Sequence, residues 1–119
     1  MTLSFEAKFV DCSDAIDGEI LQVNFDTVPA TIDEDERRTP YLLVSYHAEF
    51  PDPATVEWHD GTDDAGGGEI VSMRLERDRV SMKLGGGASF CVTFKLSEKA
   101  FTELELFLRK MIEDRVWQK

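Results

Sequence analysis

The sequence predicts an α+β fold: an antiparallel β-sheet of six or seven strands with one C-terminal amphipathic α-helix packed on one face. Apolar and polar residues alternate in short runs from residue 3 to residue 94, which is typical of strands with one dry face. After Ser97 the apolar spacing changes to that of a helix. The chain has 119 residues, the length of one domain, so residues 1–119 are expected to share one core.

The first half contains three or four of the predicted strands. Residues 3–9 alternate, a polar stretch follows at 11–18, and residues 21–25 alternate again. Residues 26–39 are expected to be a loop, because Pro29 interrupts pairing and charged residues follow it. Residues 41–46 are almost continuously apolar, which indicates a strand covered on both faces. Residues 55–59 favour a short strand, and residues 60–68, rich in Gly and Asp, a turn or loop.

The second half has the clearer pattern. Residues 71–75, 80–84 and 90–94 alternate as strands, with a hairpin turn at 76–79 and a glycine connection at 85–87. Ser97 is a natural N-cap, and Glu98 follows where the helix dipole favours an anion. An apolar stripe then runs through Phe101, Leu104 and Leu108, and we expect it to be buried against the sheet.

The charge of the chain is concentrated in its first half. Residues 1–60 hold 14 acidic and three basic side chains, a net charge of -11, whereas residues 61–119 hold ten of each. Nucleic-acid binding needs a basic footprint, and anionic membranes attract basic segments. The composition therefore argues against both partners and favours a basic protein partner, if there is one.

The cysteines and the hydropathy indicate a reducing, aqueous compartment. Cys12 and Cys91 are far apart, and nothing in their spacing requires a disulfide, so two free thiols are expected. Residues 1–10 lack the features of a signal peptide, and no apolar run approaches the roughly 20 residues of a membrane span. A cytoplasmic location is the resulting expectation.

No catalytic or metal-binding signature stands out, so no catalytic residue, metal or cofactor is predicted. His47 and His59 have acids near them but no recognised ligand spacing. Asp60, Thr62 and Asp64 copy the start of a calcium loop, but its required Gly is replaced by Ala65. Cys91 lies inside a predicted strand, where an inert packed thiol is the common case.

Two acidic segments are candidates for contact with a protein partner. The first is the loop run Asp33, Glu34, Asp35 and Glu36, whose alternative role is that of a solvated segment. The second places an aromatic beside carboxylates in the run Trp58, His59, Asp60, Asp63 and Asp64. Trp is enriched at the centres of interfaces and surrounding charge steers a partner, but Trp58 can equally be a core residue.

The order of these segments resembles a family of bacterial immunity proteins from polymorphic toxin systems, the family numbered ten. The matching stretches are residues 5–9, 40–44, 55–59, 68–70, 71–84 and 94–96, followed by the helix with Phe101, Leu104 and Leu108. The resemblance implies a non-enzymatic, cytoplasmic protein that binds and neutralises a cognate toxin domain. Two alternatives stay open: a small metal- or ligand-dependent enzyme that uses His47 or His59 with nearby carboxylates, and an oligomeric structural subunit.

Overall fold

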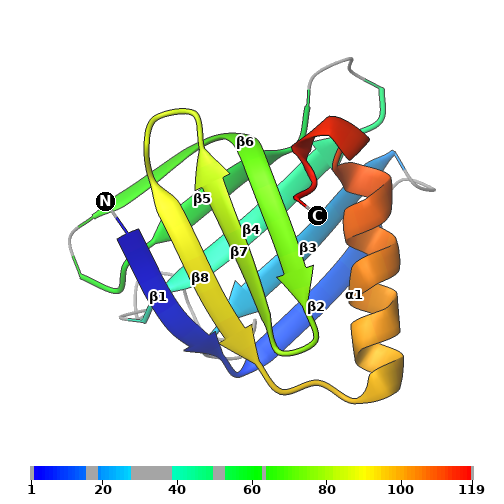
Figure 1. Ribbon diagram of the computed structural model, residues 1–119, viewed down its shortest axis with the longest axis horizontal. Coiled ribbons are helices and arrows are strands. Elements are labelled where there is room, and N and C mark those ends of the chain that lie inside the picture. Colours follow the sequence, from blue (N-terminus) through cyan, green and yellow to red (C-terminus); the bar gives the residue numbers. More distant parts are fainter. Residues whose placement is uncertain (1, 16–18, 28–38, 50–52, 63, 119) are drawn as a thin grey trace.

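The computed structural model describes residues 2–15, 19–27, 39–49, 53–62 and 64–118. The acidic run at 33–36 and Asp63 lie outside these ranges. Within them the chain forms strands β1 (Thr2–Ala7), β2 (Phe9–Ala15), β3 (Ile20–Asp26), β4 (Tyr41–His47), β5 (Thr55–His59), β6 (Ala65–Glu76), β7 (Arg79–Leu84) and β8 (Ser89–Phe94) (Figure 1). The α-helix α1 (Glu98–Met111) and the 3-10 helix η2 (Asp114–Val116) follow.

The strands form one sheet in the order β1-β8-β7-β6-β5-β4-β3-β2. All neighbouring strands are antiparallel except β1 and β8, which run parallel. The prediction of six or seven antiparallel strands is therefore wrong, because the described residues contain eight strands in a mixed sheet. The α+β class and the C-terminal α-helix agree with the structure.

The unexpected strand is β2, which includes most of the polar stretch that follows residue 10. It is an edge strand that pairs only with β3. Its partly buried apolar side chains are Val10 and Cys12, whereas Asp11 and Ser13 are exposed. A short edge strand with so little apolar surface carries a weak alternation signal, which explains why the sequence indicated a connection there.

The parallel pair joins the first strand of the chain to the last. A single residue, Lys8, separates β1 from β2, and Figure 1 shows the chain turning sharply there. From β2 to β8 the chain then passes through six antiparallel pairings in succession. β1 adds to the free side of β8 in parallel, from Thr2 opposite Ser89 to Ala7 opposite Phe94.

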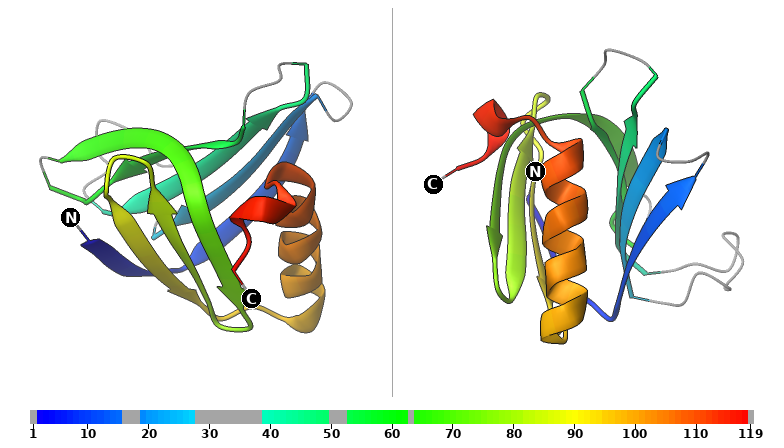
Figure 2. Two further views of the ribbon diagram at one scale, coloured as in Figure 1. Left: turned by 45° about the horizontal axis from the view of Figure 1, so that its top comes forward. Right: turned by 90° about the vertical axis from the view of Figure 1, so that its right-hand side faces the viewer.

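The sheet folds over into two layers (Figure 2). Residues 65–69 of β6 pair with β5, and residues 70–76 pair with β7. The register shifts between Ile70 and Ser72, so Val71 is the extra residue of a bulge, a feature that bends strands. We call β1, β8, β7 and residues 70–76 layer A, and residues 65–69 with β5, β4, β3 and β2 layer B.

The core lies between the two layers. Two aromatic contacts join them: the ring centroids of Phe25 and Phe94 are 6.3 Å apart, and those of Trp58 and Phe90 are 5.7 Å apart. In β3, alternate side chains at Leu21, Val23 and Phe25 are buried. This inward alternation was predicted, and it leaves the polar residues of both layers on their outer faces.

Helix α1 closes one open side of this sandwich. Ser97 caps it by accepting a hydrogen bond from the Ala100 N–H at 3.1 Å. Leu104 and Leu108 are fully buried, and the helix contacts β3 and β2. Figure 2 shows the helix between the edges of the two layers. The predicted cap and stripe are thus present, but the expected packing on one face of the sheet is wrong. The helix lies across the open side between the layers, and its stripe completes the core.

The segment after α1 returns to layer A. Trp117 forms a bridge with Met73 of β6, and the Gln118 N–H donates to the Met73 carbonyl at 2.8 Å. The Arg109 guanidinium lies 4.1 Å from the centroid of the Trp117 ring. The segment therefore covers part of an edge of β6 that would otherwise present unpaired backbone groups.

In the part of the chain that the structure describes, no helix is both long and apolar enough to cross a membrane.

Candidate binding surface

Trp58, the aromatic member of the predicted contact segment, lies in the core. Trp58 is only 9% exposed, and its ring packs against Phe90 of the other layer. A Cβ added at Gly66 would lie 3.0 Å from the indole, so the absence of a side chain at this position makes room for the ring. The structure thus gives Trp58 the packing role that the sequence left as an alternative.

His59 and Asp60 organise the turn that follows β5. The His59 ring stacks on Tyr41 with centroids 6.0 Å apart, and its Nδ1 accepts from the Gly61 N–H at 2.9 Å. The Asp60 carboxylate accepts from the Thr62 hydroxyl at 2.7 Å and the Thr62 N–H at 2.8 Å, and from the Asp64 N–H at 3.3 Å. The hydroxyl bond, the largest cause, and these backbone bonds lower the Asp60 pKa. The turn therefore holds an ionised carboxylate in a fixed position.

The charge asymmetry of the sequence becomes a difference between the layers. The strand residues of layer B contain five acids, Asp11, Asp14, Asp26, Glu57 and Glu69, and no Lys or Arg. Those of layer A contain Glu6 and Glu76 with three bases, Arg74, Arg79 and Lys83. On the outer faces, layer B presents Asp11, Glu57 and Glu69, whereas layer A presents two acids and three bases, so the two faces differ in the sign of their net charge.

The outer face of layer B combines these acids with apolar side chains. Asp11, Asn24, Leu43 and Glu57 form one row across four strands, as their register shows. Phe9, Asp26, Tyr41 and His59 form the next row. Asp11 and Glu57 are exposed, Phe9 is 39% exposed, and Asp26 is buried. We call the two rows together the layer B face.

Most of this face was not predicted from the sequence. Phe9 was placed on the apolar side of the first strand, Asp11 in a polar connection, and Leu43 in a strand covered on both faces, so no outward set was predicted at these positions. The usable signal was at Glu57, which lies between two apolar residues that point inward. What the alternation could not show is that these particular strands are neighbours in one layer.

The two histidines are far apart. His59 pairs with Tyr41 at one end of β4, and His47 is the residue at the other end. Six residues of strand separate those positions, which is roughly 20 Å. Among the described residues, no group of three or more His, Cys, Asp or Glu is arranged to hold a metal ion. Each histidine would therefore have to act without the other.

The cysteines are both free, as expected, and lie in different layers. Burial is the main cause that raises the pKa of the Cys12 thiol, to about 11, with smaller contributions from Glu103 and Asp11. A thiol with that pKa is protonated at neutral pH and is a poor nucleophile. Cys91 lies in β8, where its register partners are Ser81 and Ser4.

No family model matches the chain. No curated protein matches it either.

Proposed function

We propose that this protein is an immunity protein that binds and neutralises a basic toxin domain through its layer B face. The observation that carries the proposal is the charge of layer B, whose strand residues include five acids and no Lys or Arg. Such a face attracts a basic protein over a distance and orients it during association. The sequence resemblance to immunity proteins supports the same function.

The chemistry of the face suits a protein contact. Leu43 and Tyr41 are partly buried at its centre, with the carboxylates of Asp11 and Glu57 on either side along the rows. Neither of these two carboxylates has an ion-pair partner among the described residues, so both are available to a basic side chain. An apolar centre surrounded by charge is the arrangement that gives both affinity and orientation.

The size of the face shows how far the contact must extend. The whole outer side of layer B, with five strands about 4.8 Å apart and some six residues long, covers roughly 400 Å², and the layer B face is only part of it. A standard protein interface uses about 800 Å² of each partner. The partner must therefore also contact neighbouring segments. The turn beyond β5 is one of them, because Asp60 directly follows His59 and the Asp60 N–H donates to the Asp64 carbonyl at 3.0 Å. This turn brings the Asp60 and Asp64 carboxylates to the edge of the contact.

The function is tested by protection. Cells that express the product of a neighbouring toxin gene should survive when this protein is co-expressed, and the two proteins should form a complex. If the chain neither binds that product nor protects against it, the proposal fails. This cellular result tests the function without reference to the surface that is used.

The surface is tested by charge-neutral variants of exposed acids. Asp11→Asn and Glu57→Gln should each lower the association rate constant about two- to fivefold at low salt, with a smaller loss at high salt. Glu105→Gln is the matched control, because Glu105 is an exposed acid on α1, away from the layer B face. Equal effects of all three variants would show that only net charge matters and would reject the layer B face as the contact.

A further inference from the structure

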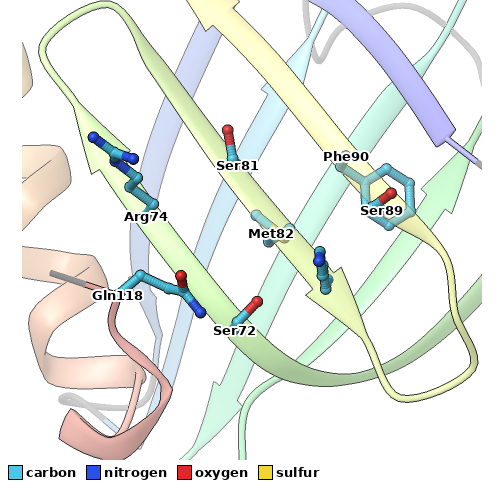
Figure 3. Close-up of a pocket in the computed structure, with 8 residues that line it drawn as sticks. Ser72, Arg74, Ser81, Met82, Ser89, Phe90 and Gln118 are labelled. Atoms are coloured by element: carbon cyan, nitrogen blue, oxygen red, sulfur yellow. The ribbon is translucent and has the colours of Figure 1, made fainter.

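The outer face of layer A carries a hollow that the proposed function does not use. It has a volume of about 260 Å³ and lies over β6, β7, β8 and the C-terminal segment (Figure 3). Its polar lining residues are Ser72, Arg74, Ser81, Lys83, Ser89 and Gln118. Met82 and Phe90, whose side chains are buried, complete its floor.

The strand register brings the polar residues together. Ser72, Lys83 and Ser89 form one row across β6, β7 and β8. Arg74 and Ser81 are paired in the next row. Figure 3 shows Gln118 extending over Ser72 from the C-terminal segment, which is anchored by its hydrogen bond to Met73. Ser72, Lys83 and the Gln118 amide therefore lie at one end of the hollow, with Arg74 and Ser81 in the neighbouring row and Ser89 on the far strand.

The bulge at Val71 is what gives the hollow its cationic wall. Ile70 faces the core, so a regular strand would also turn residues 72 and 74 inward. The register shift after Ile70 moves the inward position to Met73, which is fully buried. Ser72 and Arg74 consequently face outward, into the hollow. The bulge thus bends β6 between the layers and also turns the side chains that line this hollow outward.

The charges that line the hollow are all positive. The Arg74 Nε lies 3.0 Å from Glu76, so the terminal nitrogens of that guanidinium are not needed for this ion pair. Lys83 is exposed and has no ion-pair partner within the described ranges. No carboxylate lines the hollow, in a chain with 24 Asp and Glu residues. The local charge is therefore opposite to that of the whole molecule.

From this arrangement we infer that the hollow binds a phosphate group, either free or as a small phosphate monoester. At the end formed by Ser72, Lys83 and Gln118, a tetrahedral dianion can accept hydrogen bonds from the Ser72 hydroxyl and the Gln118 amide while Lys83 and the nearby Arg74 balance its charge. Ligand pockets commonly span about 300–1,000 Å³. A hollow of 260 Å³ lies just below that range, so it fits a phosphate with a small organic group rather than a nucleotide.

The test is a titration followed by NMR, with sodium chloride added to the reference so that the ionic strength stays constant. Inorganic phosphate should shift the amide signals of Ser72, Ser81, Ser89 and Gln118 saturably. Glycerol 3-phosphate is the second probe: tighter binding than free phosphate assigns the site to monoesters, and equal binding assigns it to the phosphate group alone. No saturable shift with either probe overturns the inference.

Two variants with a matched control locate the binding. Lys83→Met and Arg74→Gln should each weaken phosphate binding roughly tenfold, because each removes a charge-assisted contact. Lys99→Met is the control: it removes an exposed lysine on α1 and should leave the affinity unchanged. If all three variants lose the same amount of phosphate affinity, the phosphate is attracted only by net charge, and the proposed site is wrong. Binding to the toxin is measured separately, so the two proposals fail independently.

Discussion

The indole of Trp58 packs against the ring of Phe90 at a tilt of 56°, and this contact joins the two layers of the sheet. Trp58 belongs to β5 in layer B, and Phe90 belongs to β8 in layer A. They are far apart in sequence, and both are almost completely buried. Trp58, which the sequence analysis named as a candidate contact for a partner, thus packs in the centre of the fold.

This placement gives the first prediction. Trp58→Ala should lower the free energy of unfolding by about 3–5 kcal/mol, since it leaves a cavity where the layers meet. Chemical denaturation measures the change. Phe9→Ala, a substitution of an exposed aromatic on the layer B face, is the comparison and should cost much less. If the Trp58→Ala protein is as stable as the native chain but binds its partner more weakly, the prediction is wrong and Trp58 is a contact residue.

Gly67 gives a prediction about how closely β5 and β6 approach each other. A Cβ at this position would lie 2.7 Å from the carbonyl oxygen of Val56, a backbone atom that cannot move alone. Gly67→Ala should therefore destabilise the protein by about 1–3 kcal/mol in denaturant unfolding. Gly86→Ala is the matched control, because a Cβ there meets nothing within 4 Å. If both variants are equally stable, the two strands are not held this closely.

Asp60 gives a prediction about pH. Its pKa is lowered in the folded protein, chiefly by the Thr62 hydroxyl, so its ionised form stabilises the turn. That stabilisation is complete above the ordinary Asp pKa of about 3.9 and is lost as the pH falls through the lower folded value. Asp60→Asn should therefore be less stable than the native chain at pH 7, and the difference should shrink as the pH falls through this window. Thermal unfolding at several pH values measures it.

Asp64→Asn is the control for this experiment. The Asp64 N–H donates to Asp60, but the substitution leaves that backbone group in place. Its stability profile should follow that of the native chain. A difference between Asp60→Asn and the native chain that stays constant down to the lowest pH would contradict the assignment to the Asp60 carboxylate.

Cys12 gives a prediction about reactivity. Raising a thiol pKa from 9.0 to about 11 lowers its thiolate fraction about a hundredfold near pH 8. A thiolate of higher pKa is also a better nucleophile, which offsets roughly tenfold of this loss, so in a Cys91→Ser protein Cys12 should react with iodoacetamide about tenfold more slowly than free cysteine. Mass spectrometry follows the modification, and full denaturation should restore the ordinary rate. Rapid reaction in the folded protein would show that the thiol is not held as the structure indicates.

Local patterns predicted the elements whose signal is contained in a short segment. The alternation that ends at Phe94 and the stripe from Phe101 to Leu108 identified real elements, and Ser97 caps the helix as expected. The failures occurred where the signal was weak or depended on distant residues. β2 buries only part of Val10 and Cys12, so its alternation could not be separated from that of a polar connection.

The sequence did not predict which strands are neighbours in the sheet, and the reason is different. The polar alternation of a strand shows which side chains share a face, but it does not show which other strand lies beside it. The layer B face needs Asp11 and Glu57 in one row, and the hollow needs Ser72, Ser89 and Gln118 together. Both depend on pairings between segments that are distant along the chain.

The sequence by itself determined the inward side of most strands, the α-helix and its cap, and the excess of acids in the first half. These are properties of neighbouring residues, because the side-chain period of a strand or helix is local. Only the tertiary structure decided that the sheet bends at Val71, that β1 runs parallel to β8, and that the strand residues of layer B carry acids but no Lys or Arg. These features arise from long-range pairing and from the packing of two layers around one core.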